Sequence, residues 1–279
     1  MAQSLEIHTH EYFPKHGGIG RYCRELALGA TELGYAVSIR GPASAAHPRA
    51  DSQSIHKVKN GRHGPSHGPL NLWRSRRELA AVLKQEPESI HLLAEPGPVF
   101  AYGLLSRTDP KVPVLLTLHG SEIERWTNSR TSSRVAKRSF GRARHIIVPS
   151  RAIADRLRAA FPMTIDKTRV VPHALPQFFR DQARDIDNRR KPTGKHEIQL
   201  LSVGRIHPRK GFDQVLEALR QVPPGRRGAF RYTIAGARCD RAYESVLRKL
   251  AKRSGCTVDF HLDPDDSQLA EFYQTADIF

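Results

Sequence analysis

Short apolar runs alternate with segments of helical spacing from the start of the chain to Leu175. Turn residues bound the short runs, which predict strands at Leu5–His8, Ala36–Arg40, Ile55–Val58, Ile90–Ala94, Val114–Leu118, His145–Val148 and Arg169–Val171. Apolar residues return every three or four positions in the segments between them, which predict helices at Ile19–Leu33, Leu72–Lys84, Thr131–Phe140 and Ala152–Phe161. Strands and helices in alternation are typical of an α/β domain whose parallel sheet has helices on both faces.

The pattern changes after Pro172. Residues 176–196 are charged, bounded by prolines and poor in apolar periodicity, which predicts a linker. A second series follows, with strands predicted at Ile198–Val203, Tyr232–Ala235 and Thr257–Phe260 and helices at Asp213–Gln221, Arg241–Ser254 and Asp266–Thr275. The last residues, ADIF, begin a fourth strand. We therefore expect an α/β protein with a first domain at 1–175, a linker at 176–196 and a partial second domain at 197–279.

The charge balance points to an anionic partner. The chain has 279 residues, with 45 lysines and arginines against 28 aspartates and glutamates, and its formal net charge is +17. Nucleic acid, an acidic membrane surface and a phosphorylated substrate all fit such a charge, so the charge alone selects none of them.

The sequence also bears on the compartment. No apolar run approaches the roughly 18 residues of a membrane-spanning helix. The opening residues, MAQSLEIHTHEYFP, have neither the basic flank nor the apolar centre of a secretory signal, which predicts a cytoplasmic protein. Cys23, Cys239 and Cys256 are scattered without a Cys-x-x-Cys spacing, which favours reduced thiols over a disulfide framework, and we expect no structural metal.

A glycine-rich segment, GGIGRY, follows the first predicted strand and opens the first predicted helix. Gly17, Gly18 and Gly20 allow a tight turn and bring backbone amides at the positive end of a helix close to a phosphate or sugar. A plain strand-to-helix turn is the alternative. A dinucleotide site is disfavoured because Cys23 stands where the third glycine of G-x-G-x-x-G belongs, although Arg40 at the end of the second strand leaves an NADP enzyme open.

Histidines end two of the predicted strands. IHTH places His8 and His10 on one face of the first strand, where two imidazoles could share a metal. We favour ordinary strand-end residues because the chain lacks a clear set of further histidine and aspartate ligands. TLHG places His119 at the carboxyl edge of the sheet, where open α/β sheets bind ligands, so substrate contact and a structural role are balanced there.

The segment LLSVGRIHPRKGF places positive charge where a strand passes to a helix. A strand that turns at Gly204 and presents Arg205, followed by Lys210 before a helix, predicts a diphosphate site. Arginine can donate to two phosphate oxygens, and lysine adds a compact charge. A solvated basic loop is the alternative.

A basic series surrounds the third predicted helix, with almost no acidic residue in it. Arg134, Lys137 and Arg138 could lie against anionic lipid headgroups. The nucleic-acid alternative requires aromatic side chains among the charges, and the segment offers only Trp126 and Phe140.

Together these segments resemble glycosyltransferases of the GT-B fold, in particular the large retaining family of group 4 type. The resemblance spans nearly the whole chain, and it rests on segments that occur in the expected order: GGIGRY, TLHG, IIVPSRAIADRL, VVPHAL, LLSVGRIHPRKGFDQVLEAL and LAEFYQTADIF.

The resemblance implies two Rossmann-like domains, with a UDP- or GDP-linked sugar held mainly by the second and the acceptor by the first. In that arrangement Arg205 and Lys210 bind the donor diphosphate and stabilise the leaving nucleotide, which requires no metal. Gly17, Gly18, Gly20 and Gly204 bring the backbone close to the donor, and His119 contacts the donor sugar.

The expected reaction is hexosyl transfer with retention to a lipid-linked or saccharide acceptor. We expect a place in polysaccharide biosynthesis at the inner face of the membrane, and no nucleic-acid partner.

One departure from the family bears on activity. In the family, the strand that begins with ADIF is followed by a segment with paired glutamates and by helices that complete the domain, and the chain stops before them. The alternatives are therefore a truncated glycosyltransferase, a non-catalytic protein that binds a nucleotide or sugar, one half of a split enzyme, and a nucleic-acid-binding protein.

Overall fold

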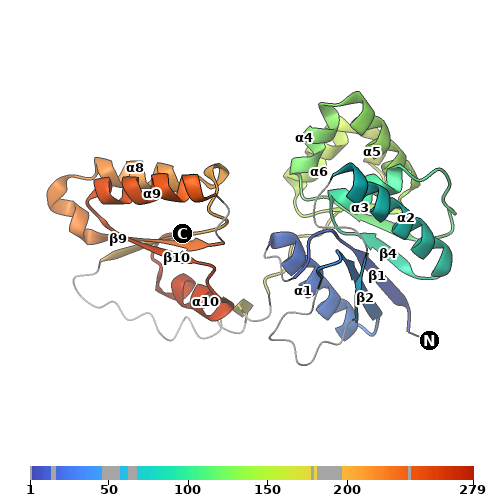
Figure 1. Cartoon of the computed structure of the whole chain (residues 1–279), viewed down its shortest axis with the longest axis horizontal. Helices are drawn as coiled ribbons and strands as arrows, with labels where there is room; N and C mark the ends of the chain where they lie inside the picture. Colours follow the sequence, from blue (N-terminus) through green and yellow to red (C-terminus); the bar gives the residue numbers. More distant parts are fainter. Residues whose placement is uncertain are drawn as a thin grey trace. The chain divides into compact units, whose positions relative to one another are not determined.

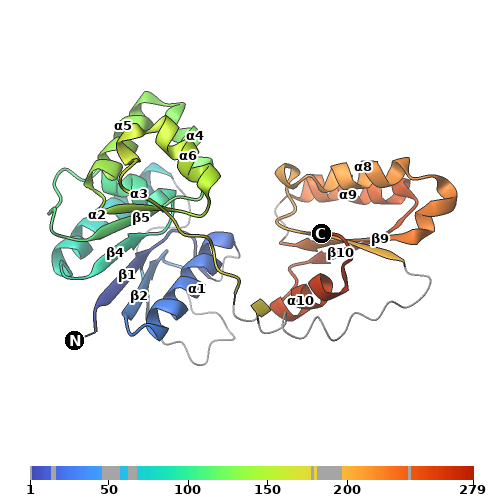
Figure 2. The ribbon, with the colours of Figure 1, turned by 180° about the vertical axis from the view of Figure 1, so that it is seen from behind.

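A computed structural model describes residues 2–13, 17–45, 57–61, 68–176, 179–180, 197–237 and 240–279. The chain divides into two compact units, Met1–Ala174 and Leu175–Phe279. Figures 1 and 2 show both from opposite sides. Most of the predicted linker, and part of the predicted strand at Ile55–Val58, lie outside the described residues.

The first unit is built on a seven-stranded sheet in which every pair of neighbours is parallel. Its strands are β1 (Ser4–His8), β2 (Ala36–Gly41), β3 (Lys57–Asn60), β4 (Ile90–Leu93), β5 (Val114–Thr117), β6 (His145–Val148) and β7 (Thr168–Val170). Their order across the sheet is β3-β2-β1-β4-β5-β6-β7. The order reverses between β1 and β4, so their carboxyl ends form the crevice where such sheets bind ligands.

Helices cover the two faces of this sheet unequally, as Figures 1 and 2 show. The helices of the unit are α1 (Gly18–Glu32), α2 (Pro69–Gln85), α3 (Pro96–Gly103), α4 (Ser121–Thr127), α5 (Arg130–Arg142), α6 (Arg151–Ala160) and the short 3-10 turn η1 (Pro162–Thr164). Right-handed crossovers place α1 on one face and the helices after β3 on the other. Two hydrophobic clusters match this division, one containing α1 and the other α2, α3, α5 and α6.

The alternation of side chains along β1 connects the sequence to these two clusters. Leu5 and Ile7 are buried in the cluster that includes α1. Glu6 and His8 point to the opposite face because successive strand residues alternate. That face therefore receives polar side chains near α2, and one of them, His8, lines a cavity described below.

Most predicted elements are confirmed within a few residues, and two helices of the first unit's described residues, α3 and α4, were missed. α3, with the sequence PGPVFAYG, is short and almost wholly buried, so it has no polar face to create a helical period. α4, SEIERWT, is only seven residues long. Both helices follow strands directly, and tertiary packing stabilises segments that are too short to show a pattern.

The second unit contains a three-stranded parallel sheet of order β10-β9-β8. Its elements are β8 (Ile198–Val203), η3 (Pro208–Lys210), α8 (Phe212–Gln221), η4 (Pro224–Ala229), β9 (Phe230–Gly236), α9 (Arg241–Ser254), β10 (Thr257–Leu262) and α10 (Asp266–Thr275). α8 and α9 lie on one face and α10 on the other (Figure 1). Ile278 forms a parallel bridge with Leu200 at the free side of β8, so the predicted fourth strand begins where a doubly wound sheet requires it.

Candidate functional site

His119 lies where β5 ends and α4 begins, and two hydrogen bonds fix its position. Its backbone amide donates to the buried carboxylate of Glu122. Its ring nitrogen Nε2 lies 2.8 Å from the carbonyl oxygen of Ala94, so Nε2 carries the proton and donates. Nδ1 is then left as an acceptor in the neutral ring. His119 can therefore accept a hydrogen bond from a hydroxyl group.

Two further aromatic rings surround His119, and sequence reasoning did not name either residue as a site residue. Tyr22 of α1 meets the His119 ring edge-on at 5.5 Å, and His173, beyond β7, stacks on it at 5.6 Å. Tyr22 and His173 are also in contact, with ring centroids 4.7 Å apart. Burial lowers the pKa of His173, and the electrostatic effect of the neighbouring His119 ring lowers it further. Both residues belong to segments that carry the family resemblance, Tyr22 to GGIGRY and His173 to VVPHAL, so the sequence could have indicated them.

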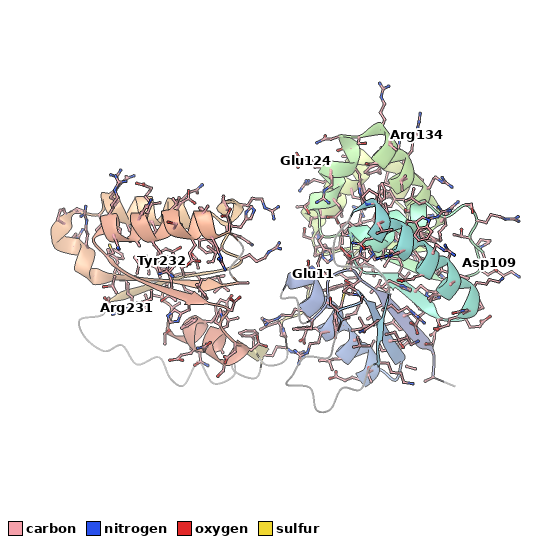
Figure 3. The ribbon with its side chains drawn as sticks, in the orientation of Figure 1. Glu11, Asp109, Glu124, Arg134, Arg231 and Tyr232 are labelled. Carbon is pink, nitrogen blue, oxygen red and sulfur yellow. The ribbon has the colours of Figure 1, made fainter. Side chains whose placement is uncertain are left out.

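The glycines of GGIGRY have different surroundings. Gly20 packs against the backbone of Glu11 and Tyr12, with 3.4 Å between those atoms and the position of a Cβ. Gly18 has open space around it. The Glu11 carboxylate, labelled in Figure 3, occupies the position that a Cβ of Gly17 would take. Gly17 precedes α1, and a negative charge is favourable at a helix N-terminus. An anion that used the amides of Gly17 and Gly18 would first have to displace that carboxylate.

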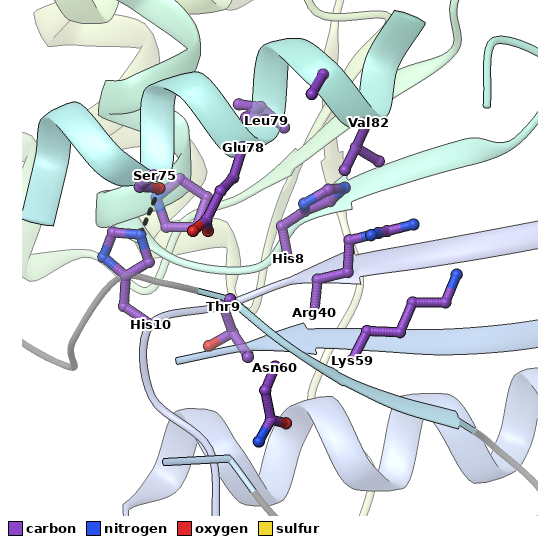
Figure 4. Close-up of a pocket in the computed structure, with 14 residues that line it drawn as sticks. His8, Thr9, His10, Arg40, Lys59, Asn60, Ser75, Glu78, Leu79 and Val82 are labelled. Carbon is purple, nitrogen blue, oxygen red and sulfur yellow. Dashed lines mark hydrogen bonds between the residues drawn. The ribbon is translucent and has the colours of Figure 1, made fainter. Parts of the chain in front are cut away.

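A cavity of about 250 Å³ lies at the carboxyl ends of β1, β2 and β3 beneath α2. His8 and His10 both line it, and each is buried (Figure 4). His10 Nε2 is 2.7 Å from the Ser75 hydroxyl, and His8 Nε2 is 3.2 Å from Nδ1 of His91. Leu79 and Val82 of α2 form an apolar wall.

The cations at this cavity are already paired. Arg40 binds the carboxylates of Glu6 and Glu86. Lys59 binds the same two groups, at 3.0 and 3.5 Å. Burial raises the pKa of Glu6, which is almost fully enclosed, and the two cations oppose that rise. With Arg40 and Lys59 neutralised, the cavity suits hydroxyl groups better than a phosphate.

Among the described residues, neither His8 nor His10 belongs to a group of three histidine, cysteine or carboxylate side chains that could hold a metal ion. Cys23 is a free, buried thiol, and burial raises its pKa, so it is not a reactive nucleophile. Cys256 is also a free thiol, and Cys239 lies outside the described residues.

The basic turn of the second unit has the geometry of an anion site. β8 ends at Val203, and the chain turns at Gly204 with the Lys210 side chain lying against it, 3.3 Å from the position of a Cβ. Arg205, His207, Arg209 and Lys210 line a shallow pocket of about 340 Å³. Arg205 and Lys210 are exposed, and no ion pair is found for either among the described residues. Their charges are available to a ligand.

Local conformation arranges this turn. Gly211 has φ +69°, a left-handed conformation that glycine adopts without strain, and α8 starts immediately after it. The Nδ1 atom of His207 accepts a hydrogen bond from the Arg209 amide at 3.2 Å. His207 Nε2 then carries the proton in the neutral ring, which adds a donor that the sequence did not identify.

The basic residues of α5 do not behave alike. Arg134 and Lys137 are exposed, and Figure 3 shows Arg134 on the outer side of the helix. Arg138 is also exposed, but one of its nitrogens donates to the carbonyl of Leu105 at 3.1 Å. Arg142 donates to the carbonyl of Tyr102, in the last turn of α3, and to those of Leu105 and Ser106, just beyond it. Part of the basic series therefore has a structural role.

Two family profiles match the chain in the order of the two units. The profile described as Glycosyltransferase Family 4 matches residues 16–176, and the profile described as Glycosyl transferases group 1 matches residues 183–279. The chain belongs to glycosyltransferase family 4. The first profile covers most of the first unit, and the second covers the basic turn after β8. Membership of this family favours a sugar-transfer protein over the nucleic-acid-binding alternative.

Solved structures agree with the family on the fold. HepE of Anabaena, in complex with UDP-glucose, is 16% identical with a TM-score of 0.66, and the match covers 99% of this chain and 72% of HepE. The catalytic domain of starch synthase IV from Arabidopsis thaliana, bound to ADP and acarbose, is 13% identical with a TM-score of 0.66, covering 100% and 77%. WaaG, a glycosyltransferase involved in lipopolysaccharide biosynthesis, is 15% identical with a TM-score of 0.62, covering 98% and 74%.

A search of curated protein sequences finds no match. The family and the structures together confirm the predicted GT-B fold: α/β, with parallel sheets of seven and three strands, the second domain being partial. Among the described residues no helix is long and apolar enough to cross a membrane.

Proposed function

We propose that this family 4 glycosyltransferase binds a UDP- or GDP-linked hexose on the basic turn after β8 and transfers the sugar with retention. The supporting observation is the pairing of Arg205 and Lys210 beside Gly204, both exposed and both lining one pocket. The glycine lets a diphosphate approach the backbone, and the two cations stabilise the negative charge that develops on the leaving nucleotide.

The remaining roles follow the two units. The first domain (1–175) holds the acceptor, the linker is 176–196, and the partial second domain (197–279) holds the donor. His119 accepts a hydrogen bond from the donor sugar through Nδ1, and Gly17, Gly18 and Gly20 bring the backbone to the donor and acceptor. The cavity below α2 binds a hydroxyl-rich part of the acceptor, because its cations are neutralised by Glu6 and Glu86.

UDP is the first nucleotide to test, since the HepE structures are complexes with UDP and glucose and with UDP-glucose. A lipid-linked or saccharide acceptor is in keeping with the role of WaaG in lipopolysaccharide biosynthesis. We place the protein in the cytoplasm, peripherally bound to the inner membrane face through Arg134, Lys137 and Arg138.

Calorimetric titration with UDP, GDP and their glucose and mannose conjugates tests the donor site. Replacing Lys210 or Arg205 by alanine should weaken nucleotide binding by at least about tenfold, since a charge-assisted contact contributes about 1.5–3 kcal/mol. Lys252→Ala, at the far end of α9, is the matched control and should leave the affinity unchanged.

The outcomes separate the alternatives. Equal affinity in Lys210→Ala and the unaltered chain would rule out the basic turn as the donor site. Binding together with slow release of free sugar or transfer to an added acceptor would show an active enzyme. Binding with neither reaction would favour the nucleotide-binding remnant or one half of a split enzyme.

A further inference from the structure

The outer face of α2 is an exposed stripe with a composition unlike the rest of the helix. Residues that face the core, Leu79, Val82 and Leu83 among them, are buried. The exposed positions recur at helical spacing and form what we call the α2 stripe: Leu70, Trp73, Arg74, Arg77, Ala80, Ala81 and Lys84. The α2 stripe contains three cations, Arg74, Arg77 and Lys84. The structure describes every residue of α2, and none of its exposed residues is acidic.

The N-terminal part of the α2 stripe exposes large apolar side chains to water. Leu70 is 59% exposed and Trp73 is 49% exposed. They are three residues apart on a helix and so lie side by side. The guanidinium of Arg77 lies 4.8 Å from the centre of the Trp73 ring, which leaves one face of the indole packed and the rest open. Adjacent exposed apolar groups of this size are typical of interaction sites.

The cations of the α2 stripe have no carboxylate partner in the part of the chain that the structure describes. Within the described part of the chain, no ion pair is found for Arg74, Arg77 or Lys84. Tryptophan and leucine beside lysine and arginine fit the boundary between water and an anionic membrane. The indole lies at the level of the headgroups there, and each cation near the surface contributes about 1 kcal/mol.

The position of α2 connects this surface to the acceptor cavity. Trp73, Arg74 and Arg77 line a groove of about 540 Å³ together with Glu78 and Ala81. Glu78 and Ala81 also line the cavity at His8 and His10. The groove and the cavity therefore share a wall. If the polar head of a molecule occupied the cavity, the part of that molecule next to the head would lie in the groove beside Trp73.

We propose that the α2 stripe binds an anionic membrane surface, with Trp73 and Leu70 inserted among the lipid headgroups. The proposal deepens the membrane association suggested above and rests on it. It assigns the apolar contact to α2, whereas α5 supplies charge alone. α2 and α5 both pack against α3 on one face of the sheet, so both helices belong to the same side of the unit (Figures 1 and 2).

Tryptophan fluorescence tests this directly, because the chain has two tryptophans with opposite environments. Trp126 is 3% exposed and packs against Phe100 and Phe140, so its emission serves as a constant background. Vesicles with about 30% phosphatidylglycerol in phosphatidylcholine, a surface that attracts basic segments, should shift the emission to shorter wavelength. Brominated lipid should quench it. Trp73→Phe should abolish both responses.

Sedimentation with the same vesicles measures the affinity. Leu70→Ser combined with Trp73→Ser should lower vesicle binding about tenfold or more, as expected when two apolar side chains lose their contact with the interface. Leu33→Ser is the matched control, because Leu33 is 80% exposed at the end of α1, on the opposite face of the sheet, and should bind as the unaltered chain does.

The results distinguish this proposal from the others. Vesicle binding that leaves the Trp73 emission unchanged would overturn the role of the α2 stripe. Vesicle binding that the double serine substitution does not weaken would overturn it as well. Either result would leave α5 as the membrane contact. A larger shift with a single-stranded oligonucleotide than with vesicles would overturn the lipid assignment. Thermal unfolding and UDP titration show whether each variant is folded. Lys210→Ala should keep full vesicle binding. A failure of the proposed donor site would therefore appear in the UDP titration and not in the vesicle measurements.

Discussion

Gly236 passes the carbonyl oxygen of Gly204 so closely that no side chain fits between them. A Cβ on Gly236 would lie 1.8 Å from that oxygen, and the residue has φ +149°. The amide of Gly204 also donates to the carbonyl of Ala235 at 2.9 Å. The position of the turn that presents Arg205 is therefore set by a glycine at the end of the neighbouring strand.

Gly236→Ala should weaken nucleotide binding and destabilise the second unit together. The unfavourable φ alone costs about 1–3 kcal/mol, and the steric overlap must move the β8 turn and with it Arg205. Urea unfolding and UDP titration check the two effects. Gly228→Ala, where the added methyl meets nothing within 4 Å, is the control. Full UDP affinity in Gly236→Ala would show that the turn is not positioned from β9.

Tyr243→Phe should loosen the start of α8. The hydroxyl of Tyr243, on α9, donates to the Asp213 carboxylate and accepts from the Asp213 amide at 3.2 Å. Phenylalanine keeps the ring and removes both bonds, so we expect about 1–2 kcal/mol lower stability. Hydrogen exchange at the first turn of α8 should rise. Unchanged exchange there would show that the amide finds another acceptor.

The same contact gives a pH dependence at alkaline pH. Burial raises the pKa of Tyr243 from 10.0 to about 12, and the hydrogen bond to Asp213 contributes. The folded state thus holds this proton more tightly than the unfolded state, so the stabilisation is complete below pH 10.0 and is lost as pH rises toward about 12. Unfolding curves of Tyr243→Phe should show a smaller loss across this interval than those of the unaltered chain.

The sequence was sufficient for the strands, because buried parallel strands are short apolar runs with clear ends. β8 and α9 begin and end where the periodicity predicts. α3 was missed because burial on all sides removes the polar face that makes a helix visible in a sequence. Its place depends on close packing against α5, where a Cβ on Gly103 would lie 2.3 Å from the carbonyl oxygen of Val135.

The site was predicted in part, for a physical reason. The turn at Gly204, Arg205 and Lys210 lies within one short segment, so its chemistry can be read locally. Tyr22 and His173 approach His119 only through the order of the strands, which brings α1, β5 and the end of β7 together. Local motifs identify residues that act alone. Contacts between distant segments require the topology.

Arg142→Ala should destabilise the first unit, which distinguishes it from its basic neighbours on α5. The guanidinium donates to three carbonyls in the last turn of α3 and just beyond it, at 2.8 to 3.5 Å, and so satisfies a helix end. We expect a loss of about 1–2 kcal/mol in urea unfolding. Arg134→Ala, on the exposed side of the same helix, should stay within about 0.5 kcal/mol of the unaltered chain. Equal stability of the two variants would contradict this role.

His119→Ala should separate binding of the sugar from binding of the nucleotide. In the proposed function His119 touches the donor sugar only, through the Nδ1 atom left free when Nε2 donates to Ala94. UDP affinity should therefore be unchanged, whereas affinity for the preferred UDP-sugar should fall about twofold to tenfold, as for one neutral hydrogen bond. His145→Ala, at the amino edge of the same sheet, should change neither. Equal losses for UDP and UDP-sugar would mean that His119 acts on the fold or on the nucleotide rather than on the sugar.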